Sequence, residues 1–462
     1  MSVTSRSAEA SAGMDNAAGT VAQSCPRVTL EIGVFFDGTG NNAANVRGPS
    51  SRISDSYNSA LSNVVLLHDR YIIDSASWPR NSCGYAIKRG AIYKQGIGTT
   101  AGESDWWPTN KYGAAVGMGP TGVESRVYAA CLDVGTKIME LSPGVEPEEV
   151  VLDVFGFSRG AAAARYFVNC FRQGYIVYNG NKASLPEGRN VRIRFVGVFD
   201  TVAAIGDGTD DDNGDVNVHM KTAQADAIMH LTAEHEYRTN FRLNHNHPGG
   251  GPYQELPGAH SDIGGGYSST EDEVLVERAR TRTFYSREQA EAARAVDAAR
   301  ALRERTSLES FYVSEGWIEP GDPQGALRNE PSQIIERRTP GLAGLVSKTY
   351  TYTTGAWLKR EVQLGLSRIA LAIMHDKALA ASVPLDGLPG TEAYTIPGDL
   401  QPMATILRAG GRPSEAMKRT ALRKFGHMSS NYDSIGMAPT PAPNGASGFK
   451  RVIYWNEAGK AK

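Results

Sequence analysis

The sequence predicts an α/β fold in which a mostly parallel sheet is flanked by helices. Three features of the 462-residue chain favour it. Short apolar runs suited to buried strands alternate with amphipathic helical segments, which is the order typical of a parallel sheet. Glycines and short polar residues follow several of these runs, as they do where a strand turns into a loop. One run passes through a Gly-x-Ser-x-Gly turn directly into a helix-forming segment.

The composition argues against several classes of protein. The formal net charge is only −2, so we expect neither nucleic acid nor a polybasic membrane surface as a partner. The sequence contains no run of about 18 apolar residues, which is the length needed to cross a bilayer. Residues 1–26 are small and polar, without the apolar centre of a secretory signal, and we expect a disordered tail. The protein is then made in the cytoplasm without a signal peptide, and only a dedicated machine would export it.

We expect no metal and no cofactor. The cysteines do not form a Cys-x-x-Cys pair: Cys131 and Cys170 are interpreted as small core residues, and a Cys25–Cys83 disulfide stays open. Five histidines lie between residues 216 and 247, and we interpret them as solvated side chains, with metal binding as the less favoured alternative.

The first predicted strand, residues 28–36, lies centrally and ends in the loop Asp37-Gly38-Thr39-Gly40-Asn41-Asn42. This loop is either an ordinary turn or a set of inward-pointing N–H groups. In the second case, the Gly38 N–H would help to bind an oxyanion. The next predicted elements are a helical segment at 58–73, a strand at 92–99 and a helix at 122–140. Trp106 and Trp107 between them are expected to pack simply, to line an acyl pocket or to lie at a lipid interface.

The strand at 150–155 leads into Gly156-Phe157-Ser158-Arg159-Gly160 and then into a run of alanines. A strand, this pentapeptide and a helix together predict a nucleophilic serine on a tight turn, Ser158. The flanking glycines leave room for that turn. The N–H of Arg159, at the start of the helix, is the expected first oxyanion donor.

Two further side chains complete a catalytic triad in this prediction. Asp200 ends the next strand, residues 191–199, and His260 follows a short strand at 253–256. The order Ser158, Asp200, His260 is that of nucleophile, acid and base in α/β hydrolases. His260 would take the serine proton and Asp200 would stabilise the imidazolium. His375 is a competing base, although its apolar helix favours a core histidine.

Beyond residue 270 the pattern changes, and residues 27–270 are the predicted catalytic core. Residues 286–306 predict a charged helix, within a helical insertion or membrane- or partner-associating region at 271–358. Residues 359–381 predict a second, amphipathic helix that docks on the sheet or, as the less favoured alternative, on a bilayer surface. Segments around Ile406 and at 451–455 close the last region, 359–462, so that the C-terminal part is mostly helical.

Taken together, the motifs resemble those of the bacterial type VI secretion lipase effectors of the Gly-x-Ser-x-Gly class, in the first phospholipase clade. The resemblance covers about residues 28–270. It rests on five motifs in order: Phe35-Phe36-Asp37-Gly38-Thr39-Gly40-Asn41-Asn42, Gly96-Ile97-Gly98-Thr99, Gly156-Phe157-Ser158-Arg159-Gly160, Phe199-Asp200-Thr201-Val202 and Gly258-Ala259-His260-Ser261-Asp262-Ile263-Gly264-Gly265-Gly266-Tyr267.

The resemblance implies an α/β-hydrolase toxin with an added membrane-associating region. Such effectors are injected into a rival bacterium's periplasm, where they deacylate phospholipids, and the family triad falls on Ser158, Asp200 and His260. A VgrG-like spike protein carries them, and a cognate immunity protein protects the producer. The sequence leaves phospholipase A1 and A2 activity both open. A soluble carboxylesterase or thioesterase, and a non-catalytic binding protein on the same scaffold, are the alternatives.

Overall fold

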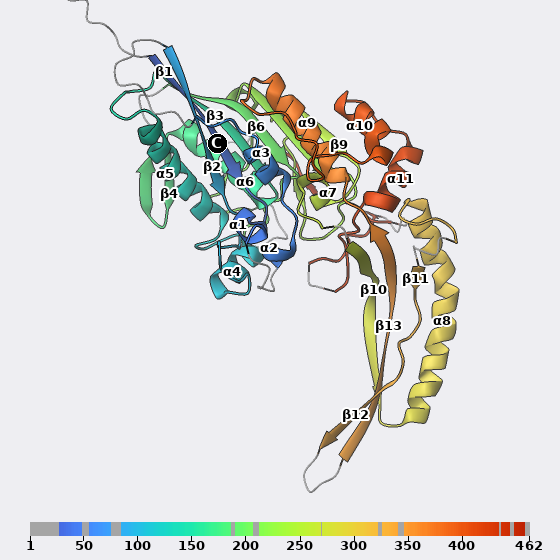
Figure 1. Cartoon of the computed structure of the whole chain (residues 1–462). Helices are drawn as coiled ribbons and strands as arrows, with labels where there is room; N and C mark the ends of the chain where they lie inside the picture. Colours follow the sequence, from blue (N-terminus) through green and yellow to red (C-terminus); the bar gives the residue numbers. More distant parts are fainter. Residues whose placement is uncertain are drawn as a thin grey trace, which may run out of the picture.

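The computed structural model describes residues 27–48, 55–74, 85–185, 190–206, 212–268, 270–321, 326–340, 346–433, 436–443 and 448–457. The expected tail at 1–26, Cys25 and Cys83 lie outside these ranges. The described chain forms a body and an arm that projects from it (Figure 1). Among the described residues, no helix is both long enough and apolar enough to cross a membrane.

The body is built on a six-stranded sheet in which every strand pairing is parallel. A parallel pairing requires a crossover connection, and helices supply it from β1 to β2, from β2 to β3 and from β3 to β6, whereas β6 to β7 and β7 to β9 are connected mainly by loops. The predicted fold class is therefore confirmed, and the predicted strands at 28–36, 150–155 and 191–199 are present. The strand order is β2 (Tyr85–Lys94), β1 (Arg27–Phe36), β3 (Glu149–Phe157), β6 (Val191–Phe199), β7 (Ala227–Ala233) and β9 (Tyr253–Leu256).

Helices cover both faces of this sheet. On one face, α5 (Val123–Leu141) and α6 (Arg159–Gln173) share a core with the even-numbered apolar residues of β1. On the other face, α3 (Asn63–His68) and α9 (Leu366–Ala380) pack over the phenylalanines of β3 and β6. Burial on both faces explains why the second halves of β1, β3 and β6 are apolar runs instead of alternating.

The predicted helix at 122–140 is α5, while the helical segment predicted at 58–73 is too long, since only the short helix α3 lies within it and α2 (Asp55–Asn58) ends where it begins. The strand predicted at 92–99 begins earlier, as β2. The remaining short elements of the body are α1 (Ala43–Val46), α4 (Pro108–Val116), β4 (Tyr175–Tyr178), β5 (Asn181–Ser184), η1 (Thr222–Gln224), β8 (Leu243–Asn244) and α7 (His260–Gly264).

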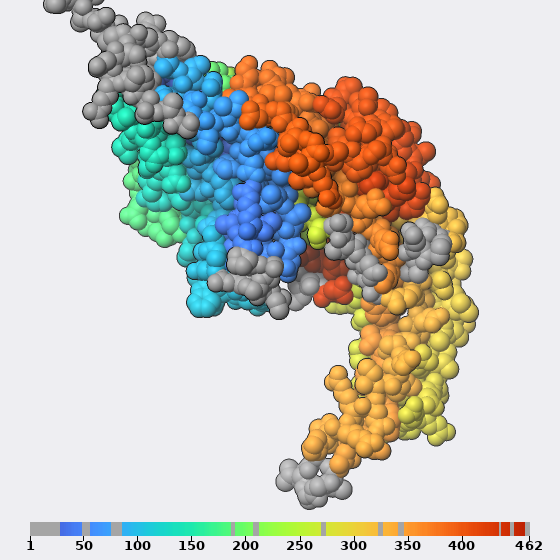
Figure 2. Space-filling model, in the orientation of Figure 1, coloured from blue at the N-terminus to red at the C-terminus, as the bar shows by residue number. Residues whose placement is uncertain are grey.

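The arm corrects part of the predicted C-terminal organisation. Residues 271–358 are not helical throughout, because the long helix α8 (Arg287–Ser314) packs beside antiparallel strands. The predicted helix at 359–381 is also too long, since β13 continues to Val362 before α9 begins. Figure 2 shows the arm, in yellow and orange, extending away from the body. Its strands are β10 (Thr270–Phe284), β11 (Ala326–Arg328), β12 (Ile335–Pro340) and β13 (Val346–Val362).

The last part of the chain returns to the body. After η3 (Gly398–Leu400), α10 (Gln401–Arg408) packs on α9, and α11 (Glu415–Phe425) lies at the base of the arm, where it contacts β13. The predicted helical C-terminal region is thus present. The chain then pairs β14 (Ile453–Tyr454) with β8 in parallel. This pairing brings the C-terminal residues to the loops at the carboxyl edge of the sheet.

Candidate active site

All five sequence-predicted site residues follow strands of the central sheet at one edge. Gly38 follows β1, Ser158 and Arg159 follow β3, Asp200 follows β6, and His260 opens α7 after β9. Because β1, β3, β6, β7 and β9 run parallel, their carboxyl ends meet along this edge, where ligands bind in sheets of this kind.

Ser158 sits on a strained turn between β3 and α6. Its backbone has φ 59° and ψ −129°, a conformation that residues other than glycine seldom adopt. The flanking glycines explain how the turn closes. A Cβ at Gly156 would lie 2.4 Å from the carbonyl oxygen of Gly160, and a Cβ at Gly160 would lie 2.2 Å from that of Asp37. Strain of this kind is retained where function requires it.

Arg159 connects the serine turn to the neighbouring loops. Its Nε donates to the carbonyl oxygens of Ala203 and Ala204, and its Nη1 donates to that of Ala114 at 2.6 Å. Burial lowers the pKa of Arg159 to about 10. The Arg159 N–H belongs to the first turn of α6, where N–H groups have no acceptor within the helix. It is therefore placed to bind an anion beside Ser158.

Asp200 and His260 form a buried pair. The Nδ1 atom of His260 lies 2.5 Å from Oδ2 of Asp200, and the two side chains are 4% and 0% exposed. The rings of Phe157 and Phe241 lie 4.7 Å and 4.9 Å from the imidazole, centroid to centroid, and hold its plane. The Nε2 atom of His260 is buried and has no hydrogen-bonding partner among the described residues.

The structure does not join Ser158 to His260 by a hydrogen bond, since no described residue is a partner of Nε2. The two residues are nevertheless held by the same neighbours. Phe157, which packs on the imidazole, directly precedes Ser158, and the Ser158 N–H donates to the carbonyl of Phe199, which directly precedes Asp200. Hydrogen bonds of catalytic groups are often long in unliganded proteins and tighten when substrate binds.

The electrostatics keep the acid ionised and the base neutral. Burial raises the pKa of Asp200, but the charge of Arg451 and the hydrogen bond from His260 outweigh it and hold this pKa well below its usual range. Burial lowers the pKa of His260, although Asp200 opposes that shift. A neutral imidazole beside a carboxylate is the form in which histidine accepts a proton.

Several charged residues around the pair were not predicted from the sequence. Arg451, from the C-terminal segment, donates from Nη1 and Nη2 to the two carboxylate oxygens of Asp200 at 2.6 and 2.8 Å. Beneath His260, Glu236 accepts from the His260 N–H and forms an ion pair with Arg238. No local sequence signal marks these residues as partners of a catalytic acid or base.

In the loop after β1, the carboxylate of Asp37 already binds the Gly38 N–H, the predicted oxyanion donor. Asp37 accepts hydrogen bonds from the Gly38 N–H at 2.8 Å and from the hydroxyls of Ser62 and Tyr93. Burial raises the pKa of Asp37 to about 6, against the opposing effect of these bonds. The Gly38 N–H would have to leave Asp37 to bind an oxyanion. The Thr39 hydroxyl is buried and has no partner among the described residues, so the loop offers a second donor that the sequence did not indicate.

The competing base, His375, has a different environment. It lies within α9, and its Nε2 lies 2.9 Å from the carbonyl oxygen of Asp386. A second acid–histidine contact joins Asp262 of α7 to His427, with 2.7 Å between Oδ1 and Nδ1. Asp262 also accepts from the N–H groups of Ala259 and His427, so this contact fastens the chain after α11 to the loop that carries His260.

Comparison with known proteins agrees with the resemblance predicted from the motifs. Residues 177–285 match the family model described as "T6SS, Phospholipase effector Tle1-like, catalytic domain". This segment contains Asp200 and His260 but not Ser158. No curated protein matches the chain.

Two solved structures align with the chain, and one of them has a similar fold. One, described as "Structure of the Tle1 effector bound to the VgrG spike from the Type 6 secretion system", aligns over 88% of this chain and 85% of its own. Its TM-score is 0.62 at 24% sequence identity. An uncharacterized protein from Pseudomonas aeruginosa aligns over 87% of this chain and 54% of its own, with a TM-score of 0.39 and 18% identity. The first of these shares the fold with this chain, and the family model matched by residues 177–285 agrees with the predicted resemblance to type VI secretion lipase effectors.

Proposed function

We propose that this chain is a type VI secretion effector that hydrolyses acyl esters of membrane glycerophospholipids as a serine-dependent phospholipase, A1 or A2. The observation that carries the proposal is the buried Asp200–His260 pair at the same sheet edge as the strained Ser158. The match of residues 177–285 to a phospholipase effector model supports the same reaction class.

In the proposed acylation step, Ser158 Oγ attacks the ester carbonyl carbon while His260 Nε2 takes its proton. Asp200 holds the Nδ1–H and stabilises the imidazolium that forms. The Nε2 atom suits this role, because within the described part of the chain it has no other hydrogen bond to give up. The imidazolium then donates its proton to the departing oxygen of the lysophospholipid, which leaves an acyl group on Ser158.

In the proposed deacylation step, His260 removes a proton from water, and the resulting hydroxide attacks the acyl carbonyl carbon. The carbonyl oxygen carries negative charge in both tetrahedral intermediates. The Arg159 N–H binds it at the start of α6, and the Gly38 N–H binds it after leaving Asp37. Release of the fatty acid returns the proton from His260 to Ser158.

The proposed delivery route follows from the similar structures and from the resemblance. The similar Tle1 effector is bound to a VgrG spike, and a VgrG-like spike is the proposed carrier of this chain. We propose that the target compartment is the periplasm of a rival cell. A cognate immunity protein would protect the producer there.

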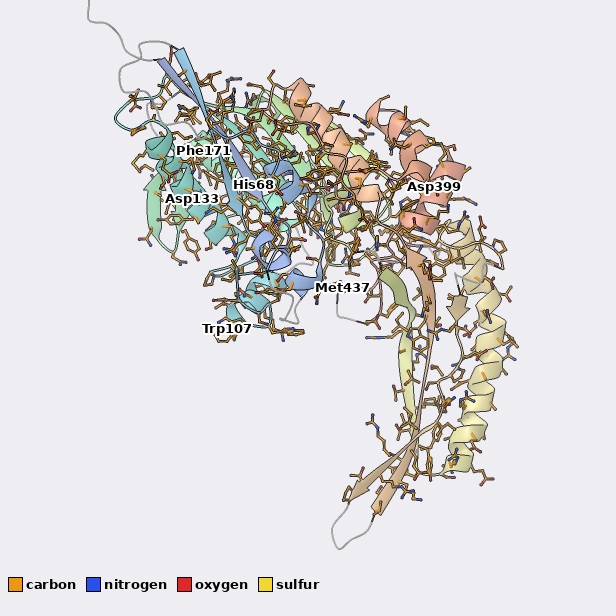
Figure 3. The ribbon with its side chains drawn as sticks, viewed as in Figure 1. His68, Trp107, Asp133, Phe171, Asp399 and Met437 are labelled. Atoms are coloured by element: carbon orange, nitrogen blue, oxygen red, sulfur yellow. The ribbon has the colours of Figure 1, made fainter. Side chains whose placement is uncertain are left out.

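An exposed apolar surface beside the serine turn favours a lipid substrate over a soluble ester. Trp106, Trp107 and Tyr112 at α4 are 69%, 60% and 51% exposed, and Met118 is 40% exposed. Figure 3 shows Trp107 at the outer edge of the body. The guanidinium of Arg159 connects α4 to the nucleophile turn. Indole rings with an apolar body and a polar N–H suit the boundary between acyl chains and headgroups.

We expect Trp106→Ser combined with Trp107→Ser to lower hydrolysis of phospholipid vesicles by about tenfold or more, because two indoles no longer enter the interface. Hydrolysis of a dispersed short-chain ester should stay within about twofold, since the triad is unchanged. Tyr285→Ser is the control, because this tyrosine is 81% exposed between β10 and α8. Equal losses on both substrates would contradict interfacial binding at α4 and favour a soluble esterase.

Product analysis tests the function directly. Wild-type protein incubated with vesicles of a phospholipid carrying two different acyl chains should release one free fatty acid and one lysophospholipid, which mass spectrometry identifies. Which chain is released distinguishes A1 from A2 activity. Neither product, together with no labelling of Ser158 by a fluorophosphonate probe, would favour the non-catalytic binding protein.

A further inference from the structure

We infer that Arg451, which lies in the C-terminal segment 448–457, is a positioning residue for the triad acid. The inference rests on the proposed serine hydrolase function. Its basis is geometric. The Arg451 side chain is 7% exposed, and its two terminal nitrogens donate to different oxygens of Asp200. Such a two-point contact fixes the plane of a carboxylate as well as its charge.

The guanidinium has no freedom to turn away from Asp200. Its Nε donates to the carbonyl oxygen of Phe241 at 3.1 Å, which Nη2 also reaches. Nη1 additionally donates to the carbonyl oxygen of Ala233 at 3.2 Å. Arg451 therefore connects three parts of the chain: the residue after β6, the end of β7 and the loop before β8. It holds Asp200 with Oδ2 facing His260.

The segment that carries Arg451 is anchored on both sides of it. The Lys450 N–H donates to the carbonyl oxygen of Thr440, and the carbonyl oxygen of Val452 accepts from the Leu243 N–H, so the backbone on both sides of Arg451 is fixed. Further along, Asn456 is 3% exposed and exchanges hydrogen bonds with the backbone of Met220. These contacts place the guanidinium by backbone pairing and not by side-chain packing alone.

The ion pair also sets the electrostatics of the base. Among the described residues, the charged groups around His260 include Asp200, Arg451, Glu236 and Arg238. The positive charge of Arg451 offsets part of the negative charge of Asp200. This partial neutralisation disfavours the imidazolium form of His260. Removal of that charge should therefore raise the pKa of His260. The neutral base would then form only at higher pH.

Two substitutions separate the geometric effect from the charge. Arg451→Lys keeps the positive charge but loses the planar two-point contact. Arg451→Met keeps an unbranched apolar stem and removes the charge. The measurement is the rate at which a fluorophosphonate probe labels Ser158 between pH 4 and 9, which reports activation of the serine whatever its natural substrate. Thermal unfolding of each protein reports the fold.

We expect labelling by the Lys variant to fall about tenfold with the acid limb of the pH profile unmoved. We expect labelling by the Met variant to fall about a hundredfold, since a small misplacement of a catalytic group has effects of that size, with its acid limb moved to higher pH. Asp37, whose pKa is about 6, is present in every variant and so does not contribute to the difference.

Tyr454→Phe, three residues further along the same segment, is the control and should label at close to the wild-type rate. Wild-type labelling in both Arg451 variants would overturn the inference, and so would equal losses with unmoved acid limbs, which indicate a structural role only. If the Met variant does not fold, the Lys variant decides: slower labelling at an unchanged melting temperature supports positioning. Absence of labelling in the wild type would instead contradict the proposed function itself.

Discussion

Ser158→Ala is expected to lower kcat for phospholipid hydrolysis by on the order of 10⁶-fold while the protein stays folded, because the members of a triad act as a unit. The fold should survive for a local reason. The hydrogen bonds that hold the turn run from the Ser158 N–H to Phe199, and from the N–H groups of Ala161 and Ala162 to the Ser158 carbonyl. All of them are backbone bonds, which alanine retains.

The measurement is fatty-acid release from vesicles, with the melting temperature recorded beside it. Ser261→Ala is the matched control, because Ser261 directly follows His260 in α7 and is the other serine closest to the base in sequence. This variant should keep wild-type activity. Undiminished hydrolysis by Ser158→Ala would contradict a serine mechanism at this turn, and loss of activity in both variants would point to a disturbed α7.

Residues whose environment is defined by their immediate neighbours in the chain were predictable. A strand, a tight turn and a helix lie within residues 149–173, and the clearances at Gly156 and Gly160 explain why that turn needs two glycines. Asp200 was predictable for a similar reason. It ends an apolar strand, and the strand pairs directly with β3, so its side chain reaches the same edge.

Contacts between distant parts of the chain were not predictable in this way. Arg451 lies 251 residues from Asp200, and Glu236 lies 24 residues before His260. An arginine followed by a short apolar run, as in residues 451–455, is compatible with many partners. Only the pairing of β14 with β8 selects Asp200 among them.

The strands of the arm did leave a signal in the sequence. Residues 349–354 read Thr-Tyr-Thr-Tyr-Thr-Thr, and β-branched and aromatic residues in alternation favour strands. In the structure this stretch lies within β13. The helix predicted from residue 359 failed at its start, because an apolar residue every second position fits the end of a strand as well as a helix face.

Asp200→Asn is expected to lower kcat by about 10⁴-fold, through the wrong tautomer of the base. Four donors converge on the two oxygens of this carboxylate: the Ala233 N–H and Arg451 Nη1 on Oδ1, and His260 Nδ1 and Arg451 Nη2 on Oδ2. In the asparagine variant, an amide nitrogen replaces one of these oxygens. This nitrogen is itself a donor, so it opposes the donors whose hydrogen bonds the oxygen accepted. If it faces His260, the imidazole turns its proton to Nε2 and can no longer accept one from Ser158.

The same substitution should also destabilise the protein, by about 3–5 kcal/mol, because it leaves the buried Arg451 without a full counter-charge. Asp153→Asn separates the two effects. Asp153 is a buried aspartate within β3 that receives two hydrogen bonds from Arg194, as Asp200 does from Arg451, but contacts no triad residue in the structure described. Its asparagine variant should also lose stability, measured by urea unfolding, although by less, because Arg194 keeps its ion pair with Glu31, and it should keep kcat within a few-fold. If both variants lost activity in proportion to their stability, Asp200 would be a structural acid, and the pairing with His260 would have no part in proton transfer.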